Sequence, residues 1–253
     1  MQVTFLGTGT SQGIPVIGCK CEVCSSADPR DKRMRTALML ENGTDRLIVD
    51  TGPDFRQQML SHKVTGITGV LITHEHNDHI AGLDDLRSFN FVSKKPVDIW
   101  AEQRVIGVLK RQFPYVFADE KYPGTPQLVL HEMNEESFDI GSFHVEPIRV
   151  YHYKLPVLGF RFGNVAYLTD VSEIPATAMK KLQGLKLLII DALRIKPHIS
   201  HFNLEEALRV VKQLKPEQAR FIHISHQLGS HTSVNAQLPD HIGPAWDGLV
   251  LNV

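Results

Sequence analysis

Residues 73–79 read Thr-His-Glu-His-Asn-Asp-His and follow directly on the apolar run 70–72. His74 and His76 lie two positions apart, so an extended segment places both imidazoles on the same side. Asp78 and His79 can reach a neighbouring point across the turn that follows. Imidazole and carboxylate groups are the usual ligands of zinc and related divalent metals. The spacing therefore predicts two adjacent metal ions rather than one.

Three further candidate ligands each close an apolar run elsewhere in the chain. His152 follows the run 143–150, Asp170 follows 165–168, and His223 follows 220–222. Side chains at strand ends are held by a sheet and still face an open edge, so ligands from distant positions can converge there. A packing role for His152, which lies between two tyrosines, and a helix-capping or turn role for Asp170 remain alternatives.

Seven ligands are enough for a site with two metal ions. In the usual arrangement one ion takes His74, His76 and His152, the other takes Asp78, His79 and His223, and Asp170 bridges the two. Ions about 3.5–4 Å apart would share a water molecule whose pKa falls from about 15.7 toward about 7. The site is therefore expected to activate water as a hydroxide, with Asp78 also orienting it.

Composition limits the class of protein. The chain has 253 residues, of which 42% are hydrophobic, and we expect one domain covering residues 1–253. Lysine and arginine number 27 against 28 aspartates and glutamates, giving a formal net charge of -1. A chain with this balance has no electrostatic reason to coat nucleic acid. Its 13 histidines agree with a metal site.

The N-terminal residues resemble a strand rather than a secretory signal, because no positive segment precedes a long apolar stretch. No window approaches the roughly 18 apolar residues of a membrane span, so the sequence predicts a cytoplasmic protein without a membrane partner. Its three cysteines are Cys19, Cys21 and Cys24. An odd, clustered set in such a protein favours metal binding over disulfides, with three reduced thiols as the alternative.

Short apolar runs bounded by Gly, Pro, Asn or Asp predict strands, and stripes of apolar residues predict helices between them. Helices are expected at 204–214, capped by Asn203 with Glu206, at about 173–182, at about 103–112, and after His79. Strands are expected at 3–6, 37–40, 47–49, 70–72, 97–100, 128–130, 143–150, 157–162, 165–168, 187–190, 220–222 and 249–253. This order favours an α/β fold in which two mixed sheets pack together with helices on their outer faces.

The His-x-His-x-Asp-His motif at residues 74–79, followed in order by His152, Asp170 and His223, resembles the metallo-β-lactamase superfamily. The resemblance implies an αβ/βα sandwich with the site at one edge. The opening residues 6–15, the cysteine cluster 19–24 and the closing residues 223–227 resemble the PhnP-type phosphodiesterases, accessory proteins of carbon-phosphorus lyase pathways. These are related to the ribonucleases that process tRNA 3′ ends.

The same resemblance assigns two further roles. Structural zinc is almost always four-coordinate, and His226 is expected to complete the site of the three cysteines, with His231 and His241 as competing ligands. His201 matches the histidine that protonates the leaving group, although His198 lies nearby. β-Lactamase activity is not expected, because no cysteine follows Cys24.

We therefore expect a metal-dependent phosphodiesterase that hydrolyses small or cyclic phosphodiesters with two Mn²⁺ or Zn²⁺ ions and one structural Zn²⁺. Two divalent ions, two aspartates and one hydroxide leave the centre a charge of about +1, which attracts an anionic diester. The alternatives are a tRNA 3′-end endonuclease, which needs a basic arm that we do not find, and a non-catalytic metal-binding accessory protein. RNA is thus not the expected partner, and a homodimer is implied by the resemblance alone.

Overall fold

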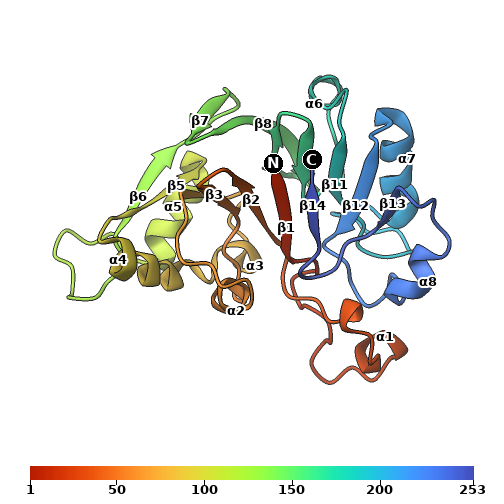
Figure 1. The fold of residues 1–253 in the computed structure, drawn as a ribbon, viewed down its shortest axis with the longest axis horizontal. Coiled ribbons are helices and arrows are strands. Elements are labelled where there is room, and N and C mark those ends of the chain that lie inside the picture. The colour runs from red at the N-terminus through yellow and green to blue at the C-terminus, as the bar shows by residue number, and fades with distance from the viewer.

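The computed structural model describes all residues 1–253 and contains two seven-stranded β-sheets packed face to face, with helices on their outer faces (Figure 1). Each sheet is mixed. In the first, β14, β1, β2 and β3 pair antiparallel and β3, β4, β5 and β6 pair parallel. The second repeats this plan, with antiparallel pairing from β7 to β10 and parallel pairing from β10 to β13. The expected sandwich of two mixed sheets is confirmed.

The first sheet, in spatial order, consists of β14 (Val250–Asn252), β1 (Gln2–Gly7), β2 (Ala37–Asn42), β3 (Asp45–Val49), β4 (Gly69–Leu71), β5 (Val97–Ala101) and β6 (Leu128–Glu132). The second consists of β13 (Ile242–Pro244), β12 (Gln218–Ile222), β11 (Leu187–Asp191), β10 (Val165–Leu168), β9 (Leu155–Phe162), β8 (Phe143–His152) and β7 (Phe138–Ile140). The termini lie side by side because β1 pairs with β14 (Figure 1).

The helices are α1 (Glu22–Ser25), η1 (Pro29–Asp31), α2 (Phe55–Ser61), α3 (Asn77–Ile80), η2 (Leu83–Leu86), α4 (Arg87–Ser93), α5 (Gln103–Gln112), α6 (Ala176–Lys181), α7 (Leu204–Leu214) and α8 (His231–Asn235). Three apolar cores lie between the layers and hold them together. One lies between the sheets, one joins α2 to α5 to the first sheet, and one joins α6 and α7 to the second. The sequence predicts α5 and α7 with the observed bounds, and the capping box of α7 is present.

Two helical predictions need correction. The helix expected from about residue 173 begins at Ala176, because the backbone N–H of Tyr151 donates to Glu173 O (3.0 Å) and holds that residue beside β8. The helix expected after His79 divides into α3, η2 and α4. Gly82 lies between α3 and η2, where the chain packs so closely that a Cβ would lie 2.2 Å from Gly52 O, and α4 follows η2 directly.

The strand directions bring the ends of β4, β8, β10 and β12 to one edge of the sandwich. β8 runs in the same direction as β10 because both pair antiparallel with β9. Asp50, Asp170 and His223, which follow β3, β10 and β12, all have left-handed backbones with φ of 67°, 57° and 53°. Such conformations cost about 1–3 kcal/mol each in non-glycine residues and gather at functional sites. No helix of the structure combines the length and apolar character needed to cross a membrane.

Candidate metal centre

The first group of possible ligands contains His74, His76, His152 and Asp170, whose ligand atoms all lie within 4.8 Å of one another. His74 Nε2 is 3.0 Å from His76 Nδ1. Asp170 Oδ2 is 3.9 Å from both His74 Nε2 and His152 Nε2. The Nδ1 of His152 donates to Ser200 O at 2.7 Å, which fixes the ring so that Nε2 faces the group. The structure therefore brings together the residues expected to hold the first ion.

The second group contains Asp78, His79, Asp170 and His223, again within 4.8 Å. His79 Nε2 lies 3.3 Å from Asp78 Oδ2 and 3.2 Å from Asp170 Oδ1. His223 Nε2 lies 3.5 and 3.4 Å from the same two oxygen atoms. Asp170 thus directs one carboxylate oxygen to each group, as a bridging ligand would.

Asp50 is part of the site, although the sequence analysis did not identify it. Its carboxylate is fully buried, lies 2.7 Å from His79 Nδ1 and accepts hydrogen bonds from the backbone N–H and hydroxyl of Thr73. A carboxylate behind a histidine ligand fixes the ring orientation and makes the other nitrogen a stronger ligand. The signal was present, because Asp50 closes the apolar run 47–49 just as the other candidates close theirs.

Another unpredicted feature is the contact between Gly52 and the metal-binding motif. A Cβ at this position would lie 2.1 Å from Asp78 O, so only glycine allows the chain to approach α3 so closely. The glycines at Gly7 and Gly9 instead accommodate the backbone of residues 33–35.

The charges of the two groups are arranged for cations. Burial opposes a charged imidazole at His79, but the carboxylates of Asp78, Asp170 and Asp50 outweigh burial and hold its pKa well above the usual value. Burial likewise opposes a charged Asp170, and His223 and His79 nevertheless hold its pKa well below the usual range. Without a metal, His79 and His223 therefore carry the charge that balances the carboxylates, whereas burial lowers the pKa of His74, His76 and His152.

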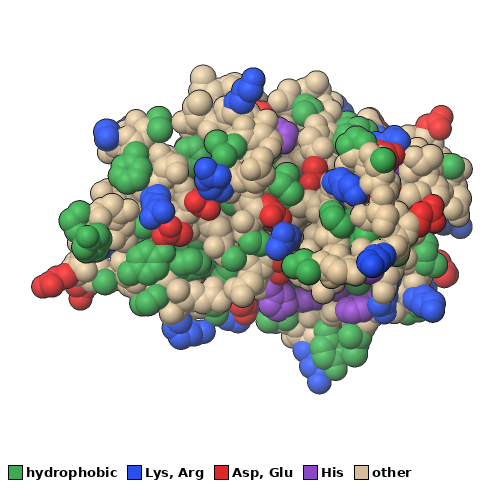
Figure 2. Space-filling view, turned by 90° about the horizontal axis from the view of Figure 1, so that it is seen from below, with side chains coloured by type: hydrophobic (Ala, Val, Ile, Leu, Met, Phe, Trp, Pro, Cys, Tyr) green, Lys and Arg blue, Asp and Glu red, His purple; other side chains and the backbone are tan.

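The donor set fits divalent transition metals. His79 Nε2 is buried without a hydrogen-bond partner, at the centre of the second group. An unpaired buried nitrogen is costly in a folded protein, and a bound cation would satisfy it. Nitrogen and oxygen ligands in these numbers suit Zn²⁺ and Mn²⁺ alike. In Figure 2, histidine side chains gather on one part of the face seen from below, with lysine and arginine side chains near them.

We predict that cation binding releases protons and strengthens as the pH rises. The pKa of His79 is raised by neighbouring carboxylates and that of His223 is raised by Asp170 despite its burial. A cation must displace these protons, so affinity should fall with falling pH, by up to about tenfold per pH unit for each proton displaced. Calorimetric titration with Mn²⁺ in buffers of different ionisation enthalpy measures the release. An affinity that does not depend on pH would contradict this protonation scheme.

His201 lies against the centre. Its ring stacks on that of His223 with the centroids 4.7 Å apart, and its Nδ1 is 3.5 Å from Asp191 Oδ2. His198 instead contacts Ser200, which makes His201 the histidine that faces the ligands. Burial, and then the charge of His223, lowers the pKa of His201 to about 4 in the metal-free protein. Donation of a proton near neutral pH therefore requires an anionic group beside the ring, which raises that pKa again. Asp191 is a second residue that the sequence analysis missed, although it ends the apolar run 187–190.

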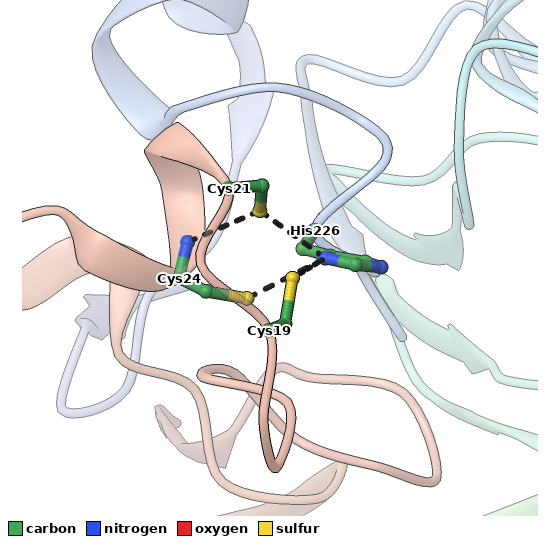
Figure 3. A group of neighbouring side chains, drawn as sticks. All are labelled: Cys19, Cys21, Cys24 and His226. Atoms are coloured by element: carbon green, nitrogen blue, oxygen red, sulfur yellow. Dashed lines mark hydrogen bonds between the residues drawn. The ribbon is translucent and has the colours of Figure 1, made fainter.

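The cysteine cluster is also assembled. The Nδ1 of His226 lies 3.3, 3.3 and 3.4 Å from the sulfur atoms of Cys19, Cys21 and Cys24 (Figure 3). Tetrahedral zinc, with Zn–S of about 2.3 Å and Zn–N of about 2.0–2.1 Å, separates such atoms by about 3.5 Å. The competing ligand His231 instead packs against Trp246, and His241 is not in the cluster.

Backbone N–H groups support thiolates at this cluster. The N–H of Cys24 donates to Cys21 Sγ (3.5 Å), and this bond lowers the pKa of Cys21 to about 6. The N–H of Val16 donates to Cys24 Sγ (3.4 Å), although burial raises the pKa of that thiol to about 11 when no metal is present. The four ligands join the N-terminal loop to a segment about 200 residues later.

We predict that Cys21→Ser lowers the zinc content by one ion per chain and lowers the melting temperature. Zinc that binds only the folded chain adds its binding free energy to stability, and each kcal/mol lost lowers Tm by about 2–4 °C in a chain of this size. Elemental analysis and thermal unfolding measure the two effects. His241→Ala, which removes an exposed histidine outside the cluster, is the matched control. An unchanged zinc content in the serine variant would reject this site.

Comparison with known proteins identifies the family. The model of the β-lactamase superfamily domain matches residues 45–224. The crystal structure of a diphosphatase from the PhnP family is 40% identical, superposes with a TM-score of 0.93, and the match covers 99% of this chain and 96% of that chain. Zn²⁺-bound PqqB from Methylobacterium extorquens shares the fold at 18% identity, with a TM-score of 0.80 over 100% of both chains.

An octanoyltransferase from Porphyromonas gingivalis is 40% identical over 98% of this chain, but that alignment covers only 51% of the relative. The chain therefore spans about half the length of the curated relatives that it matches first. The fold, the family and the donor set together support a metal-dependent hydrolase. The chain belongs to the metallo-β-lactamase superfamily, and within that superfamily it resembles the PhnP family.

Proposed function

We propose that this chain hydrolyses phosphoric diester bonds with two divalent cations. The observation that carries the proposal is the placement of Asp170, whose Oδ2 faces the first group of ligands and whose Oδ1 faces the second. A carboxylate shared in this way would hold two cations close together, and paired cations supply the positive charge that hydrolases use on phosphoryl groups. His74, His76 and His152 would hold one cation, and Asp78, His79 and His223 the other.

When bound, the cations supply the positive charge that lowers the pKa of water and stabilises an anionic phosphoryl group. The residues of the chain supply the rest. Asp78 Oδ2 lies 3.5 Å from His223 Nε2 and is in position to orient the nucleophile. His201 lies beside the ligands His223 and His152, with ring centroids 4.7 and 4.5 Å away, where it can deliver a proton to a leaving group.

Charge favours phosphate over neutral substrates. Two divalent cations contribute +4, while the carboxylates of Asp78 and Asp170 and one hydroxide contribute -3, so a charge of about +1 remains. The carboxylates of Asp50 and Asp170 are buried, that of Asp78 is partly buried, and all three already contact histidines, with Asp50 balanced by His79. With both cations bound, the centre would therefore attract an anionic diester.

The relatives support this bond type without naming the substrate. The PhnP-family relative is a diphosphatase, so it cleaves a phosphorus–oxygen bond. One relative is named an octanoyltransferase, but it is about twice as long as the part that matches this chain. Octanoyl transfer is therefore not part of the proposal. The substrate that we propose is a small or cyclic phosphodiester, or a diester of diphosphate, in which the bond that is hydrolysed also joins phosphorus to oxygen.

The test is a substrate panel assayed with purified protein and added Mn²⁺ or Zn²⁺. We expect turnover of bis(p-nitrophenyl) phosphate and of at least one cyclic phosphodiester or diphosphate diester, with loss of activity after chelation. Cleavage of precursor tRNA in preference to every small ester would favour the tRNA-processing alternative. Metal binding without turnover of any ester would favour a metal-binding accessory role and contradict the proposal.

A further inference from the structure

Helix α5 contacts the metal-binding motif at the two positions that lie between its ligands. Glu75 separates His74 from His76, and it pairs with Arg104 at the start of α5. Asn77 separates His76 from Asp78, and its Oδ1 accepts a hydrogen bond from Gln112 Nε2 at the end of α5 (3.1 Å). Residues 72–76 belong to no helix or strand. Their conformation therefore depends on such tertiary contacts.

Arg104 makes the more buried of these contacts. Its Nη1 forms an ion pair with Glu75 Oε1 and has no hydrogen-bond partner, while the side chain of Glu75 is only 18% exposed. A planar guanidinium can serve two partners in fixed directions at once. The second partner of Arg104 is the backbone oxygen of Pro156, to which Nη2 donates at 2.7 Å.

The two partners of Arg104 belong to the two segments that supply histidines to the first group. Glu75 is flanked by His74 and His76, while Pro156 pairs with Tyr151, the neighbour of His152, across the β8–β9 hairpin. The two segments are also joined by a backbone hydrogen bond, which the N–H of Leu158 donates to Thr73 O over a long distance of 3.3 Å. Arg104 thus spans the gap between ligands that lie far apart in the sequence.

We propose that Arg104 is a positioning residue that sets the affinity of the first cation site, formed by His74, His76, His152 and Asp170. This inference rests on the proposed two-cation centre. The second site does not depend on Arg104 in this way. Asp50 fixes the ring of His79, and Asp78 lies in the first turn of α3. The loss of Arg104 should therefore weaken one cation and leave the other bound.

The third partner of Arg104, Glu102, connects it to the rest of the second sheet. Its Nη2 lies 3.7 Å from Glu102 Oε2, and Glu102 in turn accepts a hydrogen bond from Arg149 Nη1 (3.0 Å) on β8. This outer pair joins α5 to β8 but contacts no metal ligand. It supports the position of the helix, whereas only Arg104 reaches the motif from this end of α5.

The experiment compares Arg104→Met, Glu75→Gln and the double variant with the wild type, each loaded with Mn²⁺ and counted by elemental analysis and binding isotherm. Arg111→Met is the matched control, since it removes the same charge from an exposed position on α5. We expect Arg104→Met to weaken one of the two active-site cations by about 10–100-fold. The control should bind both cations as the wild type does, and every variant should keep the zinc of the cysteine cluster.

The double variant tests whether Arg104 acts through Glu75. If it does, the double change should weaken the first cation no more than the stronger single change, because the interaction is already lost. Arg104→Lys should restore part of the affinity through its charge. If Arg104→Met does not fold, Glu75→Gln, which keeps the size of the side chain, carries the test.

The possible failures differ from one another. A wild type that binds only one active-site cation would refute the two-cation centre itself. A wild type with two cations and an Arg104→Met variant with unchanged affinities would refute only the positioning role. Equal weakening of both cations, or loss of the cysteine-bound zinc along with them, would show a general structural role for Arg104 and would also overturn the proposal.

Discussion

Replacement of Asp170 by alanine is expected to reduce hydrolysis to the background rate and to leave at most one weakly bound cation in the centre. The reason is the division of its carboxylate, with Oδ2 directed to the first group and Oδ1 to the second. No other residue contributes to both groups. Its removal also leaves His79 and His223 with only one of the two carboxylates that they both contact, that of Asp78.

Folding must be separated from ligation in this experiment. Asp170 has a left-handed backbone with φ of 57°, in which alanine costs about 1–2 kcal/mol. Asp170→Asn removes the charge but keeps the shape, and asparagine tolerates this conformation. We expect both variants to lose the paired cations and activity, while the asparagine variant keeps a melting temperature closer to that of the metal-free wild type. Full activity with two cations bound in either variant would contradict the bridging role.

The ligands could be predicted because each follows a recognisable local pattern. His152, Asp170 and His223 all close apolar runs, and the sheet directions bring those ends to one edge. The same pattern was present at Asp50 and Asp191, but an aspartate after a strand is also a common turn residue. Only the contacts of Asp50 with His79 and of Asp191 with His201 distinguish them.

Features that depend on packing between distant segments could not be predicted. Nothing in the sequence distinguishes Arg104 from the other arginines. Its contacts with Glu75 and with Pro156 exist only in the folded chain. The short strands β7 and β13 were missed for a related reason. Each has three residues and is defined by its pairing with β8 or β12 rather than by an apolar pattern of its own.

Replacement of His201 by alanine is expected to retain the cations and to lower kcat by about 10²–10⁴-fold, the usual contribution of a general acid or base. His201 is a member of neither ligand group, yet its ring stacks on His223 and lies beside His152. A drop in cation content instead of rate would show that His201 is a ligand. Elemental analysis of the purified variant therefore accompanies every rate measurement.

The leaving group decides whether His201 acts as an acid. A p-nitrophenolate departs without a proton, whereas an alkoxide requires one, so His201→Ala should slow alkyl esters far more than nitrophenyl esters. Asp191, buried with its Oδ2 unpaired and 3.5 Å from His201 Nδ1, is placed to hold the ring for this transfer. Asp191→Asn should therefore show the same dependence on the leaving group, to a smaller extent. Equal slowing of both ester classes would instead assign His201 to substrate binding, because the missing proton would then have no kinetic consequence.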